Sequence, residues 1–265
     1  MTFKRASHCQ SQSGFTLIEL SIVLVIIGLI VGGVLVGQDL IKAAEIRATV
    51  GQIEKYNTSV NAFRSKYKGI PGDIPNAANF WASLAGGTAS QAGEGNGDGL
   101  VQSLSADDTV CATLNCVSGE GAIFWYQLAQ ANLISEAITT TDFTDVTLAI
   151  SDSVLPLAKM GKGIRVAVNA AGGLNYFVLA NTSGTAASGV PTYAWGLTPT
   201  EAFQIDSKID DGLPAIGTVV SISAAAAPGT AVGNPCATGT ASTSIYSTVT
   251  TPNTASCNLA VRGAF

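Results

Sequence analysis

Side chains that support nucleophilic or metal-dependent catalysis are scarce in this sequence. Its one histidine is His8, so a histidine general base or a histidine metal ligand beyond the N-terminal region is excluded. Asp206, Asp210 and Asp211 cluster, but Asp also makes ordinary helix ends and turns, and nothing fixes the separation that paired carboxylates need for acid–base chemistry. No nucleophile with a neighbouring base is visible. We therefore expect a protein that is not an enzyme.

Oxygen-bearing side chains alternate in the stretch EGNGDGLV, residues 94–101. Glu94, Asn96 and Asp98 are therefore candidate calcium ligands. The stretch departs from the EF-hand pattern because it begins with Glu and has Ser105 where a bidentate Glu belongs. A turn rich in Gly and Asn is the alternative. We expect no required cofactor, and calcium is the one candidate ion.

Four cysteines follow the N-terminal region as two local pairs, Cys111 with Cys116 and Cys236 with Cys257. In an oxidising compartment each pair can close a disulfide bond. Four cysteines allow three connectivities, and buried reduced thiols are a further alternative. The second pair brackets much of residues 223–256, which are rich in Ala, Thr, Ser and Gly and predict surface loops.

The overall composition argues against a nucleic-acid-binding protein. The formal net charge is -5, and no cluster of Lys and Arg offers a surface for phosphate groups. Only 12% of the residues are charged and 29 are glycine, which suits a loop-rich protein outside the cytoplasm. We expect no direct binding of nucleic acid.

One acid, Glu19, stands near the start of the apolar segment 14–37. Residues 20–36 carry no charge, and such a run of roughly 17 to 18 residues would form about 27 Å of helix, just long enough to cross a bilayer core. Lys4 and Arg5 precede the segment, which places the N-terminus in the cytoplasm by the positive-inside rule. A charge deep in a bilayer costs on the order of 2.5–3.5 kcal/mol, so the presence of a carboxylate in this segment needs an explanation.

The stretch SGFTLIELSIVLVIIGLI, residues 13–30, resembles the type IV prepilin signature. The resemblance implies cleavage between Gly14 and Phe15 by prepilin peptidase, which also methylates the new amino group of Phe15. The apolar helix is then kept in the mature protein. It further implies that Glu19 meets the N-terminal ammonium of a neighbouring subunit, because an unpaired carboxylate in a helix bundle would be strongly destabilising.

The implied function is that of a structural subunit of a type IV pilus or a type II secretion pseudopilus. Its partners would be identical or related pilin subunits, prepilin peptidase, the inner-membrane assembly machinery and the lipid bilayer. The protein would span the bacterial inner membrane once, with its head in the periplasm, before it enters the filament. A C-terminal loop closed by Cys236 and Cys257 fits the same resemblance. The alternative is a membrane-anchored periplasmic binding module that does not polymerise.

The expected fold class is α+β, with a long N-terminal helix packed on a head that contains a small antiparallel sheet. We expect a leader at 1–14, a transmembrane and filament-core helix at 15–37, its amphipathic continuation at 38–68, and a globular pilin-like head at 69–265. The continuation carries an apolar stripe at helical spacing. Its members are Ile46, Val50, Ile53, Tyr56, Val60, Phe63 and Tyr67.

Within the head, the sequence predicts two further helices and three strands. A helix is expected over Ala122–Ile134. Another is expected after Thr198, where Thr198 and Glu201 form a capping-box pattern. Alternating apolar residues predict a hairpin across NAAGGLN, and Ala215–Ile222 reads as a further strand.

Overall fold

The computed structural model describes residues 14–81, 95–101, 119–138, 154–185, 191–222, 235–239, 243–250 and 252–265. Contacts divide the chain into two compact units, Met1–Ala44 and Glu45–Phe265. The finer division into leader, transmembrane helix, amphipathic continuation and head stays a prediction.

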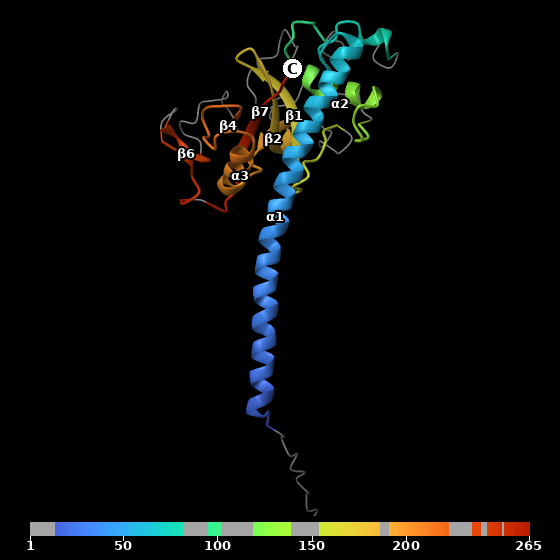
Figure 1. Cartoon of the computed structure of the whole chain (residues 1–265). Coiled ribbons are helices and arrows are strands. Elements are labelled where there is room, and N and C mark those ends of the chain that lie inside the picture. Colours follow the sequence, from blue (N-terminus) through green and yellow to red (C-terminus); the bar gives the residue numbers. More distant parts are fainter. Residues whose placement is uncertain are drawn as a thin grey trace, which may run out of the picture. The chain divides into compact units, whose positions relative to one another are not determined.

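The long helix expected at the N-terminus is confirmed as α1, Leu17–Tyr67, which has residues in both units (Figure 1). The large apolar side chains of its first part are exposed, whereas its second part buries one face. The helix ends where Lys68 adopts a left-handed conformation with φ 62°, and the Lys68 N–H still bonds to the Arg64 carbonyl at 2.9 Å. A 3₁₀ turn, η1 (Ala77–Asn79), follows.

The second unit is built on a five-stranded antiparallel sheet. Its main path is β1 (Ile164–Ala171), β2 (Leu174–Thr185), β7 (Asn258–Arg262) and β4 (Val219–Ile222), and β3 (Pro191–Ala194) pairs with β2. The predicted hairpin is confirmed: Ala171 pairs with Leu174 across Gly172 and Gly173, whose φ angles are both positive. Such a two-residue turn matches the twist of the strands.

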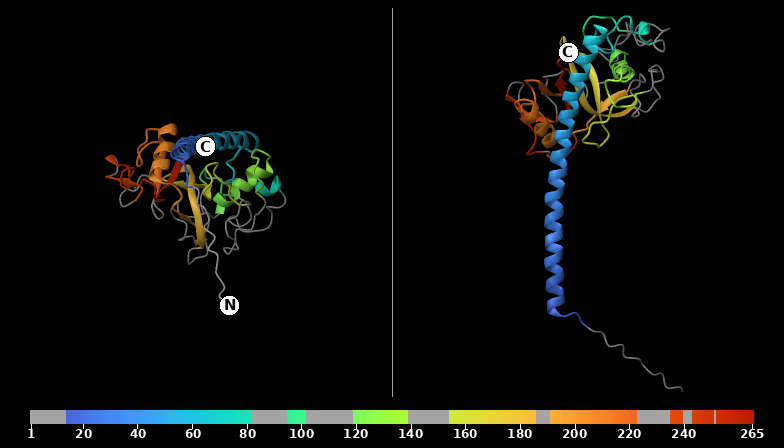
Figure 2. Two further views of the ribbon diagram at one scale, coloured as in Figure 1. Left: turned by 90° about the horizontal axis from the view of Figure 1, so that it is seen from below. Right: turned by 45° about the vertical axis from the view of Figure 1, so that its right-hand side comes forward.

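The buried face of α1 packs on this sheet. The Tyr56 ring lies 6.3 Å from the Phe177 ring of β2 and 4.7 Å from the Trp125 ring of α2 (Gly119–Gln130). Ile53, Val60 and other members of the predicted stripe belong to the same core. Within this unit α2 and α3 (Pro199–Ile209) lie on opposite sides of α1 (Figures 1 and 2). The α+β fold class is therefore confirmed.

The helix predicted over Ala122–Ile134 lies earlier in the chain, at Gly119–Gln130. It stops because Asn132 takes a left-handed conformation with φ 56°. The Leu133 N–H then bonds to the Leu128 carbonyl and the Asn132 N–H bonds to the Ala129 carbonyl. These two bonds make a Schellman motif, with Asn in the place of the usual Gly.

Two other predictions in the head need correction. The strand expected at Ala215–Ile222 is limited to Val219–Ile222, because the chain turns at Gly217 (φ 95°) and the Thr218 N–H is bonded to Asp210. The region predicted as surface loops contains a small two-stranded sheet, β5 (Ala237–Thr238) with β6 (Ile245–Tyr246).

Candidate functional site: the start of the N-terminal helix

Thr16 and Glu19 hold each other at the start of α1. The backbone N–H and the hydroxyl of Thr16 donate to Glu19 Oε2 at 2.7 and 2.8 Å, and the Glu19 N–H lies 3.3 Å from the Thr16 hydroxyl oxygen. This is the reciprocal arrangement of a capping box, which satisfies N–H groups that have no partner within the helix. The carboxylate of Glu19 therefore has a local structural role within one chain.

The helix that follows presents an apolar surface. An 18-residue window within α1 has a mean hydropathy of 2.9, and none of that window is buried. Leu17 is 88% exposed and Leu29 is 73% exposed, so the described residues leave most of these side chains uncovered. Within the described residues, α1 is the one helix long and apolar enough to cross a membrane.

Four glycines, at positions 28, 32, 33 and 37, interrupt this surface. A Cβ atom added at any of them would meet nothing within 4 Å. Contacts among the described residues therefore give no reason for their small size. Small residues at such spacings let another helix approach closely in lipid.

Residues 9–35 match the family model of the prokaryotic N-terminal methylation motif. The chain carries a prepilin-type signal. This motif is the hallmark of type IV pilin and pseudopilin precursors, and it covers both Glu19 and most of the exposed apolar stretch. No curated protein and no solved structure matches the chain.

The motif points to a structural subunit rather than to an enzyme. The apolar helix together with the motif is consistent with anchoring in a membrane. Cleavage between Gly14 and Phe15, methylation of Phe15 and pairing of Glu19 with a second subunit stay predictions. The capping role of Thr16 was not among the expectations, although Thr-Leu-Ile-Glu at 16–19 follows the S/T-x-x-E pattern that predicts it.

Two of the three candidate calcium ligands lie in the described loop 95–101, and Glu94 lies outside the described residues. Asn96 Nδ2 donates to Asp98 Oδ2 at 2.9 Å, and the Asp98 N–H donates to Asn96 Oδ1 at 2.9 Å. Asp98 Oδ1 accepts from the Leu100 N–H at 2.8 Å. These oxygens thus stabilise the turn, which was the alternative interpretation. Calcium binding stays a prediction.

The same loop encloses a buried acid, Asp73, which sequence reasoning missed. The N–H groups of Gly97 and Gly99 donate to its two carboxylate oxygens at 2.7 and 2.8 Å. Burial raises the pKa of Asp73, and these two hydrogen bonds oppose part of the rise. The Asn96 N–H donates to Glu120 of α2 at 2.9 Å. The loop therefore ties the segment after α1, which contains Asp73, to α2.

A disulfide bond joins Cys236 and Cys257, as one of the predicted pairings has it. It links the start of the β5–β6 sheet to the residue before β7 in the main sheet. Cys111 and Cys116 lie outside the described residues, so their pairing stays a prediction.

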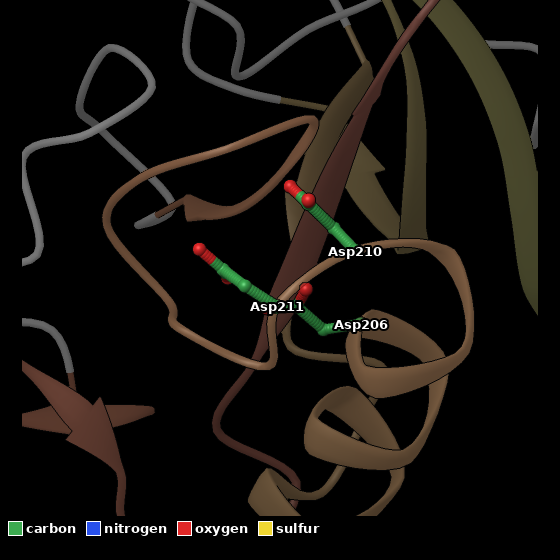
Figure 3. A group of neighbouring side chains, drawn as sticks. All are labelled: Asp206, Asp210 and Asp211. Atoms are coloured by element: carbon green, nitrogen blue, oxygen red, sulfur yellow. The ribbon is translucent and has the colours of Figure 1, made fainter.

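The predicted acidic cluster forms at the C-terminal end of α3 (Figure 3). Asp206, Asp210 and Asp211 each have a carboxylate oxygen within 4.8 Å of the others. Asp206 is fully buried, while Asp210 and Asp211 are exposed. Burial, with a contribution from the two neighbouring carboxylates, raises the pKa of Asp206 to about 6.

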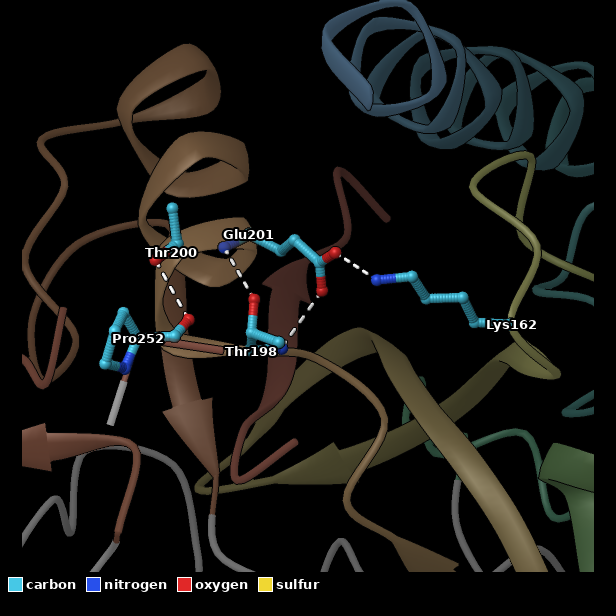
Figure 4. Close-up of polar contacts among 5 residues, drawn as sticks. All are labelled: Lys162, Thr198, Thr200, Glu201 and Pro252. Atoms are coloured by element: carbon cyan, nitrogen blue, oxygen red, sulfur yellow. Dashed lines mark hydrogen bonds and ion pairs between the residues drawn. The ribbon is translucent and has the colours of Figure 1, made fainter. Parts of the chain in front are cut away.

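The N-terminal end of α3 has the predicted capping box (Figure 4). The Glu201 N–H donates to the Thr198 hydroxyl at 3.3 Å, and the Thr198 N–H donates to Glu201 Oε2 at 3.0 Å. Lys162, from the turn before β1, pairs with the other oxygen of Glu201. Burial alone would raise the pKa of Glu201, but Lys162 and Thr198 outweigh it and lower the pKa. This contact fixes the start of α3 to the turn before β1.

Proposed function

We propose that this chain is a structural subunit of a type IV pilus or of a related filament such as the type II secretion pseudopilus. One observation carries the proposal: the methylation motif coincides with the helix of the described residues that exposes a long apolar surface. A signal that was removed together with its apolar segment would leave the protein without a surface for assembly. A cut before Phe15 would keep that surface.

An exposed apolar surface of this length is unstable in water. Each large apolar side chain gains roughly 1.5–3 kcal/mol when it is buried. The helix therefore lies first in the inner membrane, with the N-terminus cytoplasmic and the head periplasmic. It then leaves lipid for a bundle of helices from identical or related subunits, with the help of inner-membrane assembly machinery.

In this bundle Glu19 is the assembly residue. Prepilin peptidase would create an ammonium group on Phe15, and a neighbouring subunit's Glu19 would pair with it away from water. A carboxylate buried without such a partner is strongly destabilising, so the pair fixes the axial position of one subunit on the next. The intrachain bonds to Thr16 keep the carboxylate satisfied before assembly.

The proposal is tested by the mass of the processed protein and by its incorporation into fibres. Intact-mass analysis of protein from cells with active prepilin peptidase should give a chain that begins at N-methylated Phe15. Glu19→Leu should still insert into the membrane but should be absent from sheared surface fibres. A chain that retains Met1 in such cells, or normal fibres from Glu19→Leu, would contradict the proposal. An anchored binding module that does not polymerise would need neither the processing nor Glu19.

A further inference from the structure

Two adjacent depressions form a groove on the surface of the second unit. The first, of about 710 Å³, lies between the end of α1 and the loop 95–101. The second, of about 540 Å³, lies between that loop, the turn of the β1–β2 hairpin and the residues after β7. Arg64 and Gly99 line both depressions, so the two adjoin. The Ala264 N–H donates to Asn57 Oδ1 at 2.9 Å, which holds the chain after β7 beside α1 (Figure 1).

Three basic side chains from separate parts of the chain line this groove. Arg64 in the last turn of α1 and Lys68 just after it line the first depression. Arg64 and Arg262, the last residue of β7, line the second. All three residues are exposed, and within the described residues none of them forms an ion pair. Since the whole chain has a net charge of -5, the groove gathers positive charge on an acidic protein.

Acids beside the groove do not outnumber these cations. Asp73 is the one acid among the described residues that line it. It is buried, and its two oxygens accept N–H groups of the loop 95–101. Asp98 belongs to the same loop but does not line the groove, and both its oxygens accept hydrogen bonds within the loop. Even when a terminal carboxylate on Phe265 is counted, the groove has three cations and two acids.

Lys68 stands at a position that ordinarily favours glycine. Its φ is 62°, and Gly or Asn is the usual residue in this left-handed conformation after a helix. A cation near the C-terminus of a helix offsets the helix dipole, but Arg64 and Lys66 already do so in the last turn. The end of α1 therefore does not require Lys68. Strained backbone of this kind is concentrated at functional sites, and here the strained residue adds a charge to the groove.

The other lining residues narrow the class of anionic ligand. Asn61, Ser65 and Thr218 offer uncharged polar groups that can bond to hydroxyl groups. Single-stranded nucleic acid needs exposed aromatic rings on which its bases stack. The one aromatic residue among the described lining residues is Phe265, and its ring packs on Phe124 and Phe177, with ring centroids 5.7 and 5.3 Å apart. Cations beside neutral polar groups therefore favour a ligand that carries both carboxylates and hydroxyls.

We propose that this groove binds an acidic oligosaccharide. Its carboxylates occupy the two depressions, one near Arg64 and Lys68 and the next near Arg64 and Arg262. A guanidinium group suits this role because it can pair with a carboxylate through two parallel hydrogen bonds. The site belongs to the head and goes beyond the proposed filament function.

Binding of a fluorescein-labelled oligogalacturonate to the full chain in detergent micelles tests the proposal. The wild type should bind this probe but not labelled maltohexaose, a neutral sugar oligomer, and the affinity for the probe should fall as the salt concentration rises. Arg64→Gln and Arg262→Gln should each weaken binding about three- to tenfold, because each removes a charged hydrogen-bond donor. The control Arg47→Gln removes an exposed arginine of α1 that does not line the groove, and it should bind like the wild type.

Lys68→Gly separates binding from stability. Glycine adopts a φ of 62° without strain, so this variant should have a higher urea midpoint than the wild type and a lower affinity for the probe. Failure of the wild type to bind the probe, or an equal loss of affinity in Arg47→Gln, would overturn the proposal. Tighter binding of polyglutamate or of oligothymidylate at equal charge would also overturn it, in favour of an acidic peptide or a nucleic acid. None of these measurements involves fibres, so they are independent of filament assembly.

Discussion

Glu19 has one observed role and one proposed role, and substitutions at positions 16 and 19 can separate them. Within the chain its carboxylate accepts two hydrogen bonds from Thr16, and in the proposed filament its charge pairs with an ammonium group. Glu19→Gln keeps a side-chain oxygen that can accept both bonds, because capping boxes use Gln as well as Glu. It removes only the charge. Thr16→Val does the reverse, since it removes the hydroxyl and leaves the carboxylate charged.

The two losses differ in size. Loss of an N-cap costs about 0.5–2 kcal/mol and frays only the first turn of a helix that runs on to Tyr67. Removal of one partner of a buried ion pair costs about 3–5 kcal/mol, which is roughly a hundred- to several-thousand-fold in the equilibrium constant for adding a subunit. We therefore expect Glu19→Gln to abolish assembly and Thr16→Val to reduce it modestly.

The assay compares the chain in sheared fibres with the chain left in membranes, by quantitative immunoblot. The mass of the membrane-bound protein confirms that each variant has been processed equally. Fibres at wild-type level from Glu19→Gln, together with their loss in Thr16→Val, would show that Glu19 acts as a cap and that no intersubunit pair is needed.

Two further predictions concern the head, and both use urea unfolding of the full chain in micelles. A Cβ at Gly121 of α2 would lie 2.5 Å from a carbonyl oxygen of β1, so Gly121→Ala should destabilise the head by about 1–3 kcal/mol. At Gly51 on α1 nothing lies within 4 Å of an added Cβ, so Gly51→Ala should stabilise the head by up to about 1 kcal/mol. A similar change in stability in both variants would refute the close contact at Gly121. Lys162→Met should lower stability at pH 7 by up to about 1 kcal/mol, since Lys162 is half exposed. The pKa of Glu201 is lowered by folding, so the stabilisation from the ion pair is present above the ordinary pKa of Glu and is lost as the pH falls through the folded value. If the loss of stability in Lys162→Met does not shrink at acidic pH, the ion pair is not its cause.

The elements that the sequence predicts correctly are those whose signals lie within a few residues of one another. The start of α3 follows from Thr198 and Glu201, three positions apart, and both members of the box are bonded as expected. The hairpin follows from Gly172 and Gly173 between two alternating runs. The long helix follows from an uninterrupted apolar run and a stripe at helical spacing.

Strands β3 and β7 were not predicted, because their stabilising contacts come from distant parts of the chain. Strand β7 is a five-residue segment, Asn258–Arg262, too short for its alternation to be distinctive. It is a strand because it pairs with β2 on one side and β4 on the other. Its identity therefore depends on the tertiary fold.

The candidate sites also differ in whether their partners lie close together in the sequence. Thr16 could have been assigned its capping role from the sequence, because its partner is three residues away. The binding of Asp73 by Gly97 and Gly99, and of Asp206 by Tyr246, could not, because each joins segments that are 24 or more residues apart. No local pattern specifies such a pair.

The proposed function gives a physical reason why the N-terminal site can be predicted from the sequence and the polar contacts of the head cannot. An enzyme that processes the precursor at the N-terminus must recognise residues beside the scissile bond, whatever the head contains. In the proposed function, the residues for processing, membrane insertion and pairing through Glu19 would therefore lie in one short segment, and the motif matches residues 9–35. The core of the head packs on the second part of α1. The proposed role of the N-terminal segment depends on residues close to one another in the sequence, so it can be predicted without knowledge of the fold. The polar contacts of the head join distant segments, so they can be predicted only when the fold is known.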